Sequence, residues 1–327
     1  MTGEKKTPFC VLPFTQVSLY PGGRVTPCCL RSVDVVSSGI TPENLKDAIN
    51  RPEFQKLREE FLTGQVKTCA KDIANRKCNE FYAHLEPYIE KSKIISTPLK
   101  RIELRLNGHC NLKCTMCSMW EMQNGYYDRP EFWAEFEAMI PHLKEAEILG
   151  GEPFIQKDTF KMFDLFGKKN PDCPWLITTN AHWKFNDYIK SKLDLINIRR
   201  LTVSIDSLDA DVYPKIRVEG DLKVVLKTLD EIIAYRNERK ARGRGFEIVV
   251  ACVLQQQNLL ELENYIAMAA AKGIIVHFIY LEEPPTNSIS RLDAEIKTLL
   301  IDKYTKLQKR APIADLSGVI SAIQRSL

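Results

Sequence analysis

The segment Gly108-His-Cys-Asn-Leu-Lys-Cys-Thr-Met-Cys-Ser118 carries three cysteines, Cys110, Cys114 and Cys117, within eight residues. It follows the run 99–106, in which apolar and charged side chains alternate as in a strand that ends at the loop. Thiolates so close together can converge on one soft metal centre, and three of them fill three corners of a cubane iron–sulfur cluster. We therefore expect a cluster with one open iron at a strand end, where α/β sheets and barrels carry their chemistry.

A structural zinc site is the competing interpretation of this loop, because His109 could supply a fourth donor. Zinc sites normally combine two short Cys-x2-Cys or Cys/His hooks from separate turns. His109 and Cys110 are adjacent in the chain and are hard to turn toward one ion together. The spacing therefore favours the cluster.

The spacing Cys-x3-Cys-x2-Cys resembles the signature of the radical S-adenosylmethionine (radical SAM) enzymes, with a close match over residues 111–117. The resemblance implies a [4Fe-4S] cluster whose open iron binds the amino and carboxylate groups of AdoMet. One electron passed to the sulfonium would then yield a 5′-deoxyadenosyl radical. It also implies an external electron donor such as a flavodoxin or ferredoxin.

A second segment, Gly150-Gly151-Glu152-Pro153, closes the apolar run 145–149. Glycines remove side-chain bulk and let backbone groups approach a ligand closely, although a Gly-Gly pair alone is also an ordinary turn. The segment resembles the GGEP motif of the same family, whose glycines lie against the AdoMet ammonium group. The resemblance therefore implies AdoMet contacts here.

Polar residues at later strand ends complete the expected AdoMet site. Ser204 and Asp206 share one face of a strand by its two-residue repeat, so both could bond ribose hydroxyls. The resemblance implies ribose contact for Ser204, with Asp206 or Asn180 as further candidates. It also implies a carboxylate contact for Arg217 and an adenine contact for Met116. Alternatively, Arg217 is an exposed surface arginine without a ligand, and Met116 only packs against its neighbours.

Apolar strand-like runs alternate with helical patterns along most of the chain. The runs lie near 100–106, 145–149, 175–179, 200–206, 246–254 and 274–281. This alternation predicts an α/β fold with right-handed βαβ units and a parallel sheet. Six such units match the partial (β/α)6 TIM-like barrel of the radical SAM family.

Three regions are expected: a small cysteine-rich α+β domain over 1–98, the barrel over 99–284, and a helical extension over 285–327. The extension is amphipathic, so we expect its helices to pack on the barrel. A partner-binding or dimerisation role is the alternative.

The first region holds five cysteines, and a hairpin around Pro21-Gly22-Gly23 would fold Cys28 back toward Cys10. The region resembles the twitch or SPASM domains of radical SAM enzymes, including the Gly-x4-Cys spacing that ends at Cys28. The resemblance implies an auxiliary [4Fe-4S] cluster, and its expected ligands are Cys10, Cys28, Cys69 and Cys78, with Cys29 in reserve. A zinc ribbon is the alternative, because four thiolates also satisfy tetrahedral zinc.

The formal net charge of +4 is spread along the chain without a basic run, so it supports no nucleic-acid partner. No stretch of about 18 apolar residues occurs, and an apolar leader segment is not evident. We therefore expect no membrane partner and a cytoplasmic protein.

An auxiliary cluster with four cysteine ligands could accept an electron from a substrate radical, which favours an oxidative outcome on a peptide, protein or small natural product. Beside the presumed site, Trp120, Tyr126 and Tyr127 either shape a substrate entrance or form a lid that packs on the barrel. An electron carrier that does not cleave AdoMet and a zinc-stabilised scaffold are the rival functions.

Overall fold

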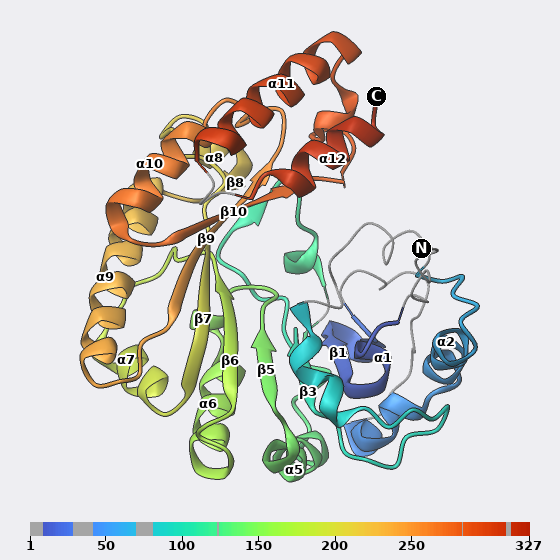
Figure 1. Cartoon of the computed structure of the whole chain (residues 1–327). Coiled ribbons are helices and arrows are strands. Elements are labelled where there is room, and N and C mark those ends of the chain that lie inside the picture. Colours follow the sequence, from blue (N-terminus) through green and yellow to red (C-terminus); the bar gives the residue numbers. More distant parts are fainter. Residues whose placement is uncertain (1–8, 29–41, 70–80, 123, 283, 312–314) are drawn as a thin grey trace.

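One continuous sheet of eight strands organises the chain (Figure 1). The computed structural model describes residues 9–28, 42–69, 81–122, 124–282, 284–311 and 315–327. Along the sheet the strand order is β10-β9-β7-β6-β5-β3-β1-β2. All neighbours are parallel except β1 and β2. The prediction of an α/β fold with a parallel sheet is confirmed.

The six strands from β3 to β10 in this sheet match the six predicted runs, with ends that differ by a few residues. They are β3 (Arg101–Leu104), β5 (Glu145–Ile148), β6 (Pro174–Thr179), β7 (Asn197–Ser204), β9 (Glu247–Leu254) and β10 (Ile275–Tyr280). Parallel strands joined by helices deliver their carboxyl ends to one edge of the sheet. Every motif identified in the barrel sequence therefore reaches the same edge.

Helices cover the outer side of this curved sheet (Figure 1). They are α5 (Pro130–Met139), α6 (Lys157–Lys169), α7 (Asp187–Asp194), α9 (Leu222–Ala241) and α10 (Leu262–Lys272). Their buried apolar side chains, such as Phe136 of α5 and Phe166 of α6, join one core with Ile102 and Ile148 of the strands. No described helix combines the length and the apolar character needed to span a membrane.

The N-terminal segment extends the barrel sheet. As predicted, β1 (Gln16–Tyr20) and β2 (Arg24–Thr26) form a hairpin around the turn η1 (Pro21–Gly23). The residues just before β1 instead form the short helix α1 (Leu12–Thr15), which has a proline in its first turn. Strand β1 pairs in parallel with β3, with Val17 opposite Ile102. The cysteine-rich region is therefore hydrogen-bonded directly to the barrel.

Two further elements of this region pack against the same core. They are the 3-10 helix η3 (Pro42–Asn50) and the helix α2 (Pro52–Thr63). Helix α2 ends at Gly64, whose φ of 72° is the left-handed conformation that favours glycine. A shorter 3-10 helix, η4 (Ala83–Tyr88), precedes β3.

The predicted C-terminal helices are α11 (Ala294–Arg310) and α12 (Ser317–Arg325). Tyr304 and Ile323 are fully buried in the main core, and the Tyr304 hydroxyl donates to the carbonyl of Leu259 at 2.7 Å. These helices pack on the barrel, as the amphipathic pattern predicted. The boundaries drawn after residues 98 and 284 stay predictions.

Candidate active site

The cysteine loop is fastened by a two-stranded ladder that sequence patterns did not predict. Strand β4 (Lys113–Cys114) pairs antiparallel with β8 (Arg217–Val218), so that Cys114 lies opposite Arg217. The amide of Thr115 adds a hydrogen bond to the carbonyl of Ile216 at 2.9 Å. Strand β8 follows the short helix α8 (Tyr213–Ile216). The ladder therefore brings the arginine singled out in the sequence beside a cysteine about a hundred residues away.

A cavity of about 190 Å³ opens at the carboxyl ends of the strands, next to this loop. Among the predicted site residues, those that line it are Cys110, Cys114, Met116, Cys117, Gly150, Gly151, Asn180, Ser204 and Arg217. Residues from five separate chain segments thus meet at one place. Three other predicted residues, Glu152, Pro153 and Asp206, lie outside the lining.

The three thiols differ in their surroundings. Cys110 and Cys114 are partly buried, whereas Cys117 is exposed. Burial raises the pKa of Cys110, and it raises the pKa of Cys114 to about 11. Asn180 donates to the Cys110 sulfur at 3.7 Å, and Arg217 donates from Nη1 to the Cys114 sulfur at 3.8 Å. A bound metal ionises its thiol ligands outright, and these donors then face the thiolates.

The donor set fits an iron–sulfur centre in its chemistry. Three thiols on one loop, with N–H donors directed at two of them, are soft ligands with the outer contacts that such clusters use. Within the described ranges, no group of three or more His, Cys, Asp or Glu side chains converges as a single metal ion would require. The assignment of these three cysteines as ligands stays a prediction.

Gly150 and Gly151 occupy positions that other residues would not tolerate. Their φ angles are 92° and 53°, in the region that favours glycine. A Cβ on Gly151 would lie 2.3 Å from the backbone oxygen of His109, in the cysteine loop. A Cβ on Gly150 would lie 2.9 Å from the side chain of Arg105. The glycine pair therefore lets the end of β5 touch the loop that carries the thiols.

Glu152 lies behind the cavity wall and binds residues that form it. Its buried carboxylate accepts hydrogen bonds from Thr179 Oγ1 and from the Asn180 amide, both at 2.7 Å, and from the Phe154 amide at 3.1 Å. Burial raises the pKa of Glu152 to about 7, although these donors oppose the shift. Pro153 is buried and begins the 3-10 helix η7 (Pro153–Ile155). The AdoMet contacts expected of Glu152 and Pro153 stay predictions.

Asp206 faces Arg217. Arg217 donates from Nε and Nη2 to Asp206 Oδ2, both at 2.8 Å, and the Val253 amide donates to Oδ1 at 2.7 Å. Both side chains are buried. The arginine expected to be free for the AdoMet carboxylate is thus anchored at one side by this carboxylate. The ribose contact expected of Asp206 stays a prediction.

The aromatic loop after the third cysteine divides into two parts. Tyr127 is 2% exposed and donates to the carbonyl of Tyr20 at 2.8 Å, and Tyr126 packs over Gly23. Both tyrosines therefore pack on the β1–β2 hairpin. Trp120 instead lines the cavity.

The N-terminal cysteines lie only partly within the described ranges. Cys10 and Cys28 are half-buried and pack against the same small cluster of Val11, Leu12 and Leu85, which agrees with the predicted hairpin. Cys69 is also half-buried. Cys29 and Cys78 lie outside the described residues. The expected ligand set for an auxiliary cluster therefore stays a prediction.

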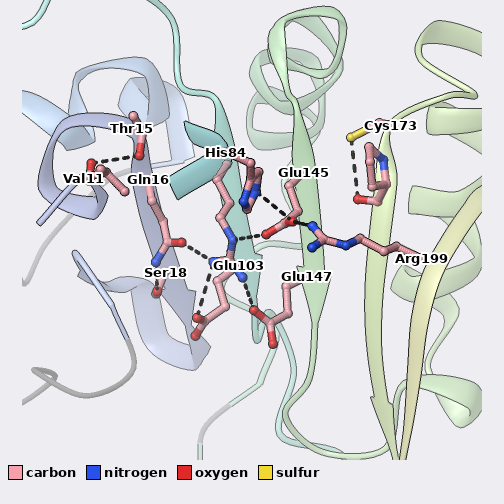
Figure 2. A network of polar contacts seen from close by, with 12 residues as sticks. Val11, Thr15, Gln16, Ser18, His84, Glu103, Glu145, Glu147, Cys173 and Arg199 are labelled. Carbon is pink, nitrogen blue, oxygen red and sulfur yellow. Dashed lines mark hydrogen bonds and ion pairs between the residues drawn. The ribbon is translucent and has the colours of Figure 1, made fainter. Parts of the chain in front are cut away.

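A buried ion network on the inner side of the sheet was not foreseen (Figure 2). Arg101 is fully buried and pairs with Gln16 of β1, with Glu145 at 2.6 Å and with Glu147. Glu145 also contacts His84 at 3.1 Å. The network joins the N-terminal region to barrel strands β3 and β5.

Comparisons with known proteins agree with this geometry. The model of the Radical SAM superfamily matches residues 104–268, half of the chain, and a model described as an iron–sulfur cluster-binding domain, SPASM, matches residues 10–79. An open α/β barrel with a cysteine-lined cavity at its strand ends defines a class of cofactor-dependent enzymes. Within that class, the chain belongs to the radical SAM superfamily.

Several curated relatives are GTP 3′,8-cyclases. The protein from Nautilia profundicola is 26% identical over 217 residues, which cover 64% of this chain and 64% of the relative. The protein from Saccharophagus degradans is 25% identical over 211 residues, which cover 62% and 59%. The chain thus spans less than two thirds of the length of these relatives.

Among solved structures, Streptococcus suis SuiB bound to its precursor peptide SuiA has a TM-score of 0.46 and 18% identity, and covers 75% of this chain and 52% of that one. SuiB bound to S-adenosylmethionine also has a TM-score of 0.46, with 16% identity, and the match covers 88% of this chain and 67% of that one.

The two family models also identify the cofactors. As a radical SAM enzyme, the chain uses a [4Fe-4S] cluster and AdoMet, and its SPASM region carries an auxiliary iron–sulfur cluster.

Proposed function

We propose that Cys110, Cys114 and Cys117 hold the [4Fe-4S] cluster and that the adjoining cavity binds AdoMet for reductive cleavage. The observation that carries this proposal is the convergence of three thiols, two glycines of positive φ and the anchored Arg217 on one cavity. When bound, the cluster and AdoMet supply a 5′-deoxyadenosyl radical that abstracts hydrogen from a substrate C–H bond. The chain contributes binding, orientation and the exclusion of stray hydrogen donors.

Each wall of the cavity has a part in this proposal. The glycine pair leaves backbone groups open to the AdoMet ammonium, and Arg217 uses its remaining donors for the carboxylate. In this proposal Ser204 and Asn180 bond the ribose and Met116 contacts the adenine; all three residues line the cavity. Asp206 and Glu152 act from behind, because they hold Arg217 and Asn180 in place.

For the substrate, we propose a peptide, protein or small natural product and an oxidative outcome assisted by the auxiliary cluster. Cys10, Cys28, Cys69 and Cys78 are its proposed ligands, and a flavodoxin or ferredoxin is the proposed electron donor. A purine nucleotide is the second candidate substrate, because the curated relatives are named GTP 3′,8-cyclases.

The test is anaerobic reconstitution of the parent chain and of the variant Cys110→Ala/Cys114→Ala/Cys117→Ala, followed by addition of dithionite and AdoMet. The parent should form 5′-deoxyadenosine and methionine, and the triple variant should form neither while it retains auxiliary iron and sulfide. Cys173→Ala is the matched control, because Cys173 is buried away from the cavity. A fully loaded parent that leaves AdoMet intact would overturn the proposal.

The substrate question needs separate arms. Acceleration of 5′-deoxyadenosine formation by GTP, with deuterium transferred from labelled GTP, would favour the nucleotide. Acceleration by a peptide library, with a mass loss of two hydrogens in a peptide, would favour the oxidative peptide reaction.

A further inference from the structure

Trp120 stands at the edge of the cavity, in a short turn directly after the third cysteine. The turn is the 3-10 helix η5 (Met119–Glu121). The indole Nε1 donates to the carbonyl of Cys117 at 2.8 Å, and the side chain is 37% exposed while it also lines the cavity. The indole is therefore hydrogen-bonded to the cysteine loop and is also partly exposed to solvent.

The cavity is too small for the ligand proposed for it. Its volume is about 190 Å³, whereas sites for ligands of this size typically measure about 300–1,000 Å³. This cavity would enclose AdoMet only if part of its wall moved outward.

Most of the wall is fixed by the fold. Thr178, Ser204 and Val253 belong to strands β6, β7 and β9. Each of these strands pairs with a neighbouring strand on both sides, and each of the three residues lies within one of these ladders. The glycine pair is fixed by its close approach to the cysteine loop. Strand positions of this kind move only with the sheet.

The wall formed by Trp120 has fewer constraints. Two turn hydrogen bonds span η5, from the Glu121 amide to Ser118 and from the Met122 amide to Met119, both at 3.1 Å. The indole itself is held by one hydrogen bond to a carbonyl. Among the aromatic residues of this loop, Tyr126 and Tyr127 pack on the hairpin. Trp120 is thus the large side chain of the wall whose displacement disturbs the least structure.

From this arrangement we infer that Trp120 is the movable wall of the AdoMet cavity. In the observed position the indole narrows the cavity, and on binding it rotates away from the Cys117 carbonyl and lies with one face against the nucleoside. Aromatic faces stabilise such contacts, and indole also interacts favourably with a cationic ligand. The inference rests on the proposed function, because it requires AdoMet in this cavity.

The first test follows the indole itself. The chain is labelled with 5-fluorotryptophan, reconstituted anaerobically, kept oxidised so that AdoMet is not cleaved, and titrated with AdoMet in ¹⁹F NMR spectra. The Trp120 resonance, assigned with Trp120→Phe, should shift on titration. The Trp133 resonance is the internal control, because Trp133 is buried in α5 and contacts Lys161. A Trp120 resonance that stays fixed while AdoMet binds would overturn the inference.

The second test measures AdoMet binding by rapid mixing and by equilibrium dialysis. Trp120→Ala should speed AdoMet association and weaken affinity by roughly two- to tenfold, the loss expected for one aromatic contact. Trp120→Phe should recover most of the affinity, and Trp133→Phe should match the parent. Unchanged association and affinity in Trp120→Ala would refute the movable wall while leaving AdoMet binding established. Failure of the parent to bind AdoMet would instead refute the proposed function.

Discussion

Arg217 reaches Asp206 through two nitrogens that share one carboxylate oxygen, both at 2.8 Å. Arg217 lines the cavity, and Asp206 is buried behind it. The remaining nitrogen, Nη1, points to the sulfur of Cys114 at 3.8 Å. A guanidinium is planar and rigid, so fixing one edge fixes the direction of the other donors. Asp206 therefore sets where Arg217 can meet an anion, and we assign it as a positioning residue.

This relationship predicts the effect of Asp206→Asn on AdoMet affinity. The amide cannot hold the guanidinium as the carboxylate does, so the dissociation constant for AdoMet should rise by roughly tenfold. Equilibrium dialysis against the oxidised, cluster-loaded protein measures it. Asp230→Asn is the control, since Asp230 is an exposed partner of Lys272 far along α9.

A double-mutant cycle separates positioning from a direct contact with the ribose. If Asp206 acts through Arg217, the variant Asp206→Asn/Arg217→Ala should bind AdoMet no more weakly than Arg217→Ala alone. If the losses of binding free energy in the two single variants add up in the double variant, Asp206 has its own contact with AdoMet.

Gly151→Ala should abolish binding of the AdoMet-site cluster. The new methyl group would lie 2.3 Å from the His109 oxygen, a backbone atom of the loop that bears Cys110, so the loop must shift. Iron and sulfide analysis should show loss of one cluster's content, with auxiliary iron retained. Gly243→Ala is the matched control, because Gly243 also has a positive φ, 73°, but nothing lies within 4 Å of a Cβ there. Equal cluster loss in both variants would attribute the effect to backbone strain instead.

Much of the barrel site could be predicted because each motif stands at the end of an apolar strand. Cys110, Gly150, Asn180 and Ser204 follow β3, β5, β6 and β7 or end them, and parallel strands bring such ends to one edge. Local sequence patterns were therefore enough to predict which distant residues meet, since the parallel sheet brings the ends of its strands together.

Two features escaped this reasoning for physical reasons. Strands β4 and β8 have two residues each, too few for any periodicity, so the pairing of Cys114 with Arg217 left no signal. Alternation of apolar and charged residues, as in β3, is typical of strands with one face toward water. The structure instead buries Arg101 and Glu103 on the inner face. Arg101 pairs with Glu145 and Glu147 of β5, and Glu103 pairs with Arg101 and Arg105.

That inner network predicts a large loss of stability in Arg101→Met. Removing the guanidinium leaves the partly buried Glu147 without its cation and leaves the buried Glu145 with Arg199 as its remaining arginine partner. We expect the free energy of unfolding to fall by about 3–5 kcal/mol. Urea denaturation of the metal-free chain measures the change. Lys93→Met is the control for an exposed pair, with Glu59, and should cost no more than about 1 kcal/mol. A loss in Arg101→Met as small as in this control would contradict the network's role.

The last prediction concerns the two buried cysteines outside the proposed ligand sets, Cys173 and Cys252. Burial raises the pKa of Cys173 to about 12 and raises that of Cys252 well above the usual range. Because the thiolate is the reactive form, a raised pKa keeps both thiols protonated and inert until the solution becomes strongly alkaline. At about pH 8, iodoacetamide should therefore label the exposed Cys117 of the folded, metal-free chain and spare these two.

Peptide mass spectrometry after quenching measures labelling at each cysteine. The same reaction in urea should label Cys173 and Cys252 as well, because unfolding restores their ordinary pKa and exposes both sulfurs. Labelling of Cys173 in the folded chain at the rate of Cys117 would show that its thiol is neither buried nor raised in pKa. It would then have to be reconsidered as a functional thiol rather than a packing residue.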